Sequence, residues 1–116
     1  MDRAVFDRDE VIERLGHDGR LARELLETFL AESPGMQAEL QAALEAGDTV
    51  GVERLAHGWR GALASVSAGA AAAAARALEL RARERDREAC RAAAEALSTE
   101  IARLERALSA YLGGAT

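Results

Sequence analysis

The sequence predicts an all-α protein, an antiparallel up-and-down four-helix bundle with a short extra helix at its amino end. Its composition favours helix: alanine occupies 28 of 116 positions, aromatic residues make up 3%, and Pro34 is the single proline. Apolar residues recur at intervals of three and four, as they do on one face of a helix. Turn-forming residues separate these segments by short distances, which makes successive helices antiparallel neighbours.

A short helix is expected first. Its apolar cluster of Val11, Ile12 and Leu15 ends at residues 16–19, Gly-His-Asp-Gly, which form a turn by composition. His17 lies in that turn and matches no motif, so we interpret it as a loop residue.

A longer helical pattern runs from Leu21 to Gly47. Ser33-Pro34-Gly35 interrupts it, because proline has no backbone donor and crowds the preceding turn. We expect a kink or a restart there, with Ser33 as the N-cap of a restarted helix. The apolar face on either side of the interruption consists of Leu21, Leu25, Leu26, Phe29, Leu30, Met36, Leu40, Ala43 and Leu44.

Three further helices complete the pattern. Asp48 and Asp86 are predicted N-caps, residues 65–69 a turn, and Gly113-Gly114 the end of the last helix. We interpret the alanine run 70–75 as a close contact between helices. Cys90 lies on an apolar face and is interpreted as a small core residue. The predicted core includes Leu26, Phe29, Leu55, Trp59, Leu63, Leu78, Leu97, Ile101 and Leu104.

The composition also excludes several classes of protein. One cysteine cannot form a disulfide within the chain, and no apolar run is long enough to cross a membrane. The first residues lack a basic region followed by an apolar stretch, so no secretory signal is expected. A net charge of −5 argues against nucleic-acid binding. We expect one cytoplasmic domain over residues 1–116, monomeric and independent of membranes.

One position has the character of a chemical site. At 100° per residue, His57 lies opposite the apolar stripe of its helix and shares a face with Arg60, Gly61 and Ala64. Glycine in a helix interior costs roughly 0.8–1.0 kcal/mol relative to alanine, and an exposed face gives no packing reason for it. Close approach by another molecule does. A neutral histidine can accept a phosphoryl group, and Arg60 can neutralise its charge. The alternative is an ordinary surface histidine.

The residues around this position resemble a known family. Ala56-His57-Gly58-Trp59-Arg60-Gly61 resembles the A-H-x-L-K-G motif of histidine phosphotransfer (HPt) domains. Residues 25–34 (LLETFLAESP) resemble that family's L-L-x-x-F-L-x-x-x-P, and residues 42–48 (AALEAGD) its A-L-x-x-G-D. Leu78-Glu79 fits its L-E. The resemblance covers about residues 6–110 and implies a four-helix bundle with an exposed, phosphorylatable histidine.

The resemblance assigns roles position by position. It makes His57 the phospho-accepting residue, places Arg60 where the family has lysine, and makes Gly61 the glycine that lets a receiver domain approach. Ser67 stands where a glycine is common. Glu79 follows His57 at the spacing of a glutamate in chemotaxis kinases, where that carboxylate accepts a hydrogen bond from the histidine.

Alternatives remain for several of these side chains. Glu79 can instead be a solvated carboxylate on a helix surface. Arg76 and Arg83 flank it and are candidates either for binding phosphate or for ordinary ion pairs within the helix. The partner surface around Gly61 and Ala64 is expected to be shallow. Its candidate extension is the amino-terminal cluster of Val11, Ile12 and Leu15, whose alternative role is to cap the core.

Three functions are compatible with these residues. The first is a phosphocarrier that takes a phosphoryl group on His57 from a receiver-domain aspartyl phosphate and relays it to another receiver. The second is the phosphotransfer segment of a chemotaxis-type histidine kinase, and the third a helical module that binds a receiver or kinase without chemistry. The expected partners are response-regulator receiver domains and a histidine kinase. The chain has no nucleotide-binding motif, so we expect no kinase activity of its own, and Mg²⁺ only on the partner receiver.

Overall fold

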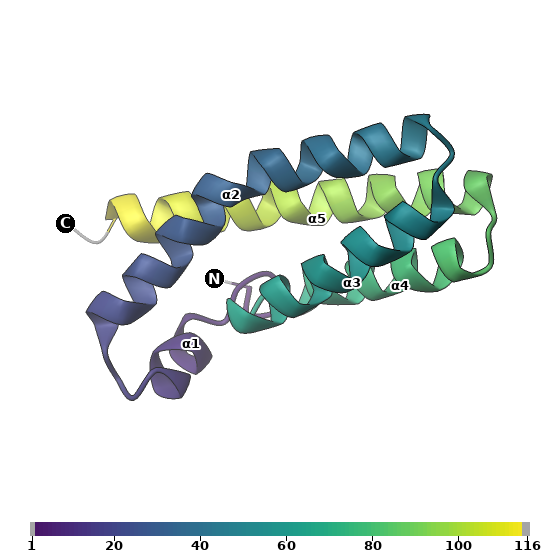
Figure 1. Cartoon of the computed structure of the whole chain (residues 1–116). Coiled ribbons are helices and arrows are strands. Elements are labelled where there is room, and N and C mark those ends of the chain that lie inside the picture. The colour runs from purple at the N-terminus through teal and green to yellow at the C-terminus, as the bar shows by residue number, and fades with distance from the viewer. Residues whose placement is uncertain (1, 115–116) are drawn as a thin grey trace.

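A computed structural model describes residues 2–114 of the chain and contains five helices within them. These are α1 (Arg8–Arg14), α2 (Gly19–Glu45), α3 (Thr49–Ser65), α4 (Gly69–Arg83) and α5 (Arg87–Gly114). The long helices α2 and α5 lie side by side, and the shorter pair α3 and α4 packs against them (Figure 1). The molecule measures 44 × 20 × 20 Å. The predicted bundle with a short additional helix is confirmed.

Aspartates begin four of the five helices. The side chains of Asp48 and Asp86 accept hydrogen bonds from the backbone amides of Gly51 (2.9 Å) and Ala89 (3.0 Å), as predicted. Two other aspartate caps were not predicted. Asp7 caps α1 and Asp18 caps α2.

Pro34 lies inside a continuous helix. α2 runs through it for 27 residues, and the ribbon changes direction in the middle of that helix (Figure 1). The expected kink is therefore present, but the expected restart with Ser33 as N-cap is wrong. Ser33 is buried, and its hydroxyl instead donates to Glu105 Oε2 on α5 at 3.0 Å.

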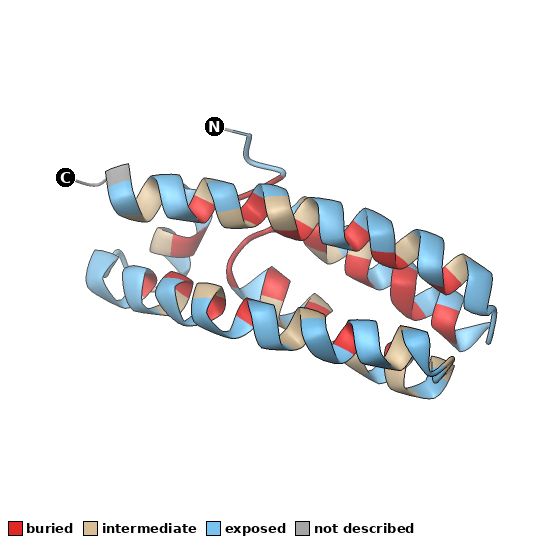
Figure 2. Cartoon of the chain, turned by 90° about the horizontal axis from the view of Figure 1, so that it is seen from above, coloured by how far each residue is buried: buried red, intermediate tan, exposed pale blue. Residues whose placement is uncertain are grey.

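The core lies between α2, α3, α4 and α5, with exposed residues on their outer faces (Figure 2). Eight of the nine predicted core residues are buried. Leu55 is only half-buried, because it lies toward the edge of the stripe on α3. Leu21 was assigned to an apolar face and is 45% exposed, whereas Ala22 beside it is buried.

The amino-terminal segment closes one end of the bundle, a feature that periodicity did not reveal. Val5 and Phe6 are buried although they precede the first helix. The Phe6 ring lies 5.7 Å from that of Tyr111 on α5, and the Ala70 amide at the start of α4 donates to Ala4. The N-cap residue of α4, Ala68, has no side chain that can accept a hydrogen bond from the first amides of the helix. The carbonyl of Ala4 accepts one of these hydrogen bonds in its place.

None of the helices within residues 2–114 is long and apolar enough to cross a membrane.

Truncation of Trp59 tests the orientation of α3. Trp59 is almost fully buried and packs edge-on against Phe29, with ring centroids 6.0 Å apart. Trp59→Ala should lower the free energy of unfolding by about 3–5 kcal/mol, because it removes buried surface and leaves a cavity. Urea unfolding would measure this, with the exposed Leu80→Ala as a control that changes stability little. Unchanged stability of Trp59→Ala would contradict the orientation.

Candidate functional site

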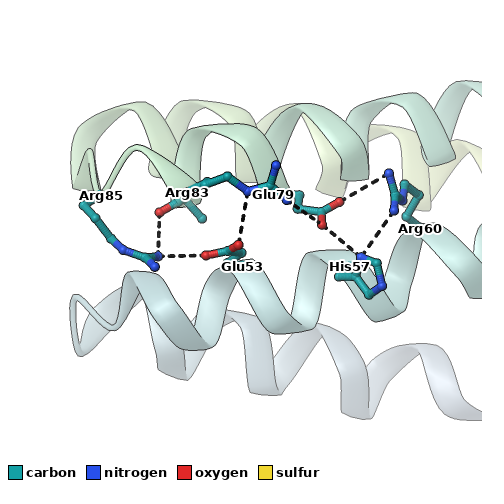
Figure 3. A network of polar contacts seen from close by, with 7 residues as sticks. Glu53, His57, Arg60, Glu79, Arg83 and Arg85 are labelled. Atoms are coloured by element: carbon teal, nitrogen blue, oxygen red, sulfur yellow. Dashed lines mark hydrogen bonds and ion pairs between the residues drawn. The ribbon is translucent and has the colours of Figure 1, made fainter.

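His57 lies in the middle of α3 and is 64% exposed at its side chain, whereas Glu79 on α4 is 6% exposed. Their side chains meet across the helix pair, with His57 Nδ1 2.9 Å from Glu79 Oε2 (Figure 3). An ionised carboxylate only accepts hydrogen bonds, so the ring carries its hydrogen on Nδ1 and donates it. The neutral ring then has its lone pair on Nε2, which points away from Glu79 (Figure 3).

Arg60 lies one turn beyond His57 and is the second partner of this carboxylate. Its NH1 is 3.6 Å from Glu79 Oε1, and its NH2 is 3.3 Å from His57 Nδ1. Because Nδ1 already carries a hydrogen, Arg60 cannot donate to it, and the guanidinium is held by Glu79 instead. The residue in the family's lysine position is therefore an ion-pair partner of the carboxylate that orients the histidine.

Arg83 connects Glu79 to a second carboxylate. Its NH2 lies 3.3 Å from Glu79 Oε2, and its Nε lies 3.3 Å from Glu53 Oε2. Glu53 also accepts a hydrogen bond from Arg85 NH1, at 2.9 Å (Figure 3). The ion pair between Arg83 and Glu79 within α4 matches the intrahelical alternative, and its extension to α3 was not foreseen. We call Glu53, Arg60, Glu79, Arg83 and Arg85 the charged cluster.

Arg85 is held in an uncommon backbone conformation. Its φ is +61°, in the left-handed region, at the turn that follows α4. This conformation costs roughly 1–2 kcal/mol for a residue with a side chain. It lets Arg85 NH1 donate both to Ala82 O at 2.9 Å and to Glu53. The hydrogen bonds from Arg83 and then Arg85 hold the pKa of Glu53 below its ordinary value.

The helix face beyond His57 is open, as expected. Gly61 and Ala64 are exposed, and a Cβ atom added at Gly61 would meet nothing within 4 Å. On the other side of His57 is a hollow of about 430 Å³. It is lined by Val50, Glu53, Arg54, His57, Glu79 and Arg83. Val50 and Arg54 were not predicted as site residues, although both lie on the face of His57, two turns and one turn before it.

Arg14 anchors α1 beside the carboxyl end of α3. It donates to Ser65 O and to the Ser67 hydroxyl, both at 2.7 Å, and to Ala64 O at 3.2 Å. Ser67, at φ +55°, also donates to Glu10 at 2.7 Å. These bonds hold a serine in a left-handed turn position where the family commonly has glycine.

The expected partner role of the amino-terminal cluster is only partly compatible with this arrangement. Val11 is 1% exposed, so its assignment to a partner surface is wrong: it packs in the core. Ile12 and Leu15 are half-buried against the core and retain some exposed surface.

No group of three potential metal ligands occurs among the histidine, cysteine, aspartate and glutamate side chains of residues 2–114. Cys90 is buried, as interpreted, and desolvation raises the pKa of its thiol.

Comparisons with known proteins agree with this geometry. The model of the family described as Hpt domain matches residues 24–107. The fold is similar to the crystal structure of the HPT domain from a sensor hybrid histidine kinase of Shewanella, with a TM-score of 0.86, 20% identity, and coverage of 99% of each chain. It is also similar to histidine-containing phosphotransfer protein B from Pseudomonas aeruginosa PAO1, with a TM-score of 0.83, 26% identity, and coverage of 93% of this chain and 95% of that chain. A search of curated proteins found no match.

The lowered pKa of Glu53 predicts a pH-dependent contribution to stability. A carboxyl group with a depressed pKa in the folded state stabilises the fold fully above its unfolded pKa, and this contribution disappears as the pH falls through the folded value. Glu53→Gln should therefore unfold at a lower temperature than the wild type at pH 7, and the difference should shrink as the pH is lowered from 7 past the ordinary pKa of a glutamate carboxyl. Thermal unfolding across this range would measure it.

The exposed Glu39 on α2 provides the control as Glu39→Gln. Equal behaviour of the two variants at every pH would mean that Arg83 and Arg85 do not stabilise the charge of Glu53.

Proposed function

Because the chain belongs to the Hpt domain family, we propose that it carries a phosphoryl group on His57, which it accepts from the aspartyl phosphate of one receiver domain and passes to another. The observation that supports this residue is the 2.9 Å bond between Nδ1 and the buried Glu79. That bond fixes the hydrogen on one ring nitrogen and leaves the lone pair on the exposed one.

The transfer follows from this arrangement of the ring. The Nε2 lone pair attacks phosphorus, the bond from phosphorus to the aspartyl oxygen breaks, and its electron pair leaves with the carboxylate. The hydrogen on Nδ1 stays in the bond to Glu79, so the phosphorylated ring is positively charged and the carboxylate stabilises it. Delivery to a second aspartate reverses these steps.

The proposal extends to partners and cofactors. The chain acts as a monomeric single domain in the cytoplasm, with receiver domains and a histidine kinase as partners. It has no kinase activity of its own. The Mg²⁺ ion that assists phosphoryl transfer belongs to the acidic pocket of the receiver.

Labelling from phosphorylated receiver domains tests the role of His57. Wild-type protein should take up label in an acid-labile, alkali-stable form, as expected of a phosphoramidate, and His57→Gln should take up none. Glu79→Ala should bind the receiver normally but accept label more slowly, by about 10- to 100-fold, because its ring is no longer oriented.

Other results would contradict parts of the proposal. Label that persists on His57→Gln would place the phosphoryl group on another residue. Receiver binding without any labelling would favour a binding module. Labelling by ATP and the catalytic domain of a chemotaxis-type kinase, but by no receiver, would favour the kinase segment.

The open face around Gly61 gives a prediction with opposite signs in two assays. Gly61→Gln should stabilise the protein by up to about 1 kcal/mol, because glutamine is the better helix former and its Cβ atom meets no neighbour. It should also slow transfer from a receiver by at least about tenfold, because the longer side chain obstructs close approach to His57.

Gly35→Gln is the matched control for this variant. Gly35 is an exposed glycine inside α2, and a Cβ atom added there also meets nothing within 4 Å. Its substitution should stabilise the protein similarly and leave transfer unchanged. Normal transfer by Gly61→Gln would mean that the receiver docks elsewhere.

A further inference from the structure

The hollow beside His57 has one cationic side chain that the proposed chemistry does not yet use. Arg54 lies on α3, one turn before His57, and lines this hollow together with His57 and Arg83. Side chains three residues apart on a helix have Cβ atoms roughly 5–6 Å apart. The guanidinium of Arg54 is therefore within reach of a group attached to the outward nitrogen of the imidazole.

Arg54 differs from Arg83, the other arginine that lines the hollow, and from Arg60 and Arg85 in having no carboxylate partner among residues 2–114. Arg60 pairs with Glu79, and Arg83 pairs with both carboxylates of the charged cluster. Arg85 is held by Glu53. Within residues 2–114, no carboxylate lies within ion-pair distance of Arg54, which is exposed.

The charge balance of the site makes a free cation important. The charged cluster contains three guanidiniums and two carboxylates, so its net charge is +1. A phosphoryl group adds about −1.5 to −2 charges at neutral pH. The guanidiniums of the cluster already share their hydrogen-bond donors with carboxylates. An arginine whose guanidinium makes no ion pair with a carboxylate can donate hydrogen bonds to the phosphoryl oxygens.

We propose that Arg54 binds the phosphoryl group carried on His57 Nε2, donating hydrogen bonds to its oxygens from the side of the hollow. This inference rests on the proposed function, since it requires a phosphoryl group on His57. It assigns the two sides of His57 to different tasks. Gly61 and Ala64 leave room for the receiver on one side, and Arg54 contacts the phosphoryl group on the other.

Titration of the phosphorylated protein by ³¹P NMR tests this contact without a receiver. The protein would be phosphorylated with phosphoramidate, and the second ionisation of the phosphoryl group followed against pH. A guanidinium in contact favours the dianion, so its loss in Arg54→Gln should raise the pKa of the phosphoryl group by about 0.3–0.7 units, the size expected for one exposed ion pair. Arg54→Lys should restore most of the wild-type value.

Two further arginines provide matched controls. Arg91→Gln removes the same charge from the exposed face of α5, beside a separate groove between α2 and α5, and should leave the titration unchanged. Arg76→Gln removes it from α4, three residues before Glu79 and outside the lining of the hollow, and should have less effect than Arg54→Gln.

The outcomes separate this inference from the proposed function. Equal titrations for Arg54→Gln, Arg91→Gln and wild type, or a larger shift for Arg76→Gln, would overturn the contact with Arg54 while leaving His57 as the carrier. A wild-type protein that gains no ³¹P signal on His57, judged against His57→Gln, from either phosphoramidate or a phosphorylated receiver would overturn both.

Discussion

The buried carboxylate of Glu79 is the constraint on which the arrangement around His57 depends. Removing an ionised carboxylate from water costs several kcal/mol unless other groups compensate its charge. The side chain of Glu79 is 6% exposed, and its charge is compensated by the imidazole N–H of His57 and by the guanidiniums of Arg60 and Arg83. Two of these partners, His57 and Arg60, come from α3. The same contacts therefore fix the ring, select its tautomer and align α3 with α4.

Arginines hold the histidine helix at both of its ends. Near the amino end, Arg83 and Arg85 bind Glu53 from α4 and the turn after it. At the carboxyl end, Arg14 from α1 binds the last carbonyls of α3. His57 lies between these anchors, so the helix that presents it is fixed although its exposed face carries only small side chains at Gly61 and Ala64. The small residues that a partner needs for close approach are thus compatible with a well-positioned nucleophile.

Much of this arrangement could be predicted from the sequence, because helical periodicity is local information. The apolar stripe of α3 placed His57 outward and Trp59 inward, whereas Glu79 was predicted as its partner from the resemblance to chemotaxis kinases. The contacts of Ser33 and Glu53 could not be predicted in this way. Ser33 reaches a residue of α5, and Glu53 depends on the left-handed backbone of Arg85. The burial of Phe6 could not be predicted, because it precedes the first helix and is not part of a helical pattern of apolar residues.

The exposure of His57 has a consequence for how long a signal can last. With 64% of this side chain in contact with solvent, a phosphoryl group on its outer nitrogen would stand in bulk water, not in a closed active site. Within residues 2–114 no segment covers this side chain, so a partner can reach the phosphoryl group without a prior opening step. Its lifetime between encounters is then set by the intrinsic hydrolysis of the phosphorus–nitrogen bond and by the few charges around it. The duration of the phosphorylated state is then a property of the phosphorus–nitrogen bond and not of a protein conformation.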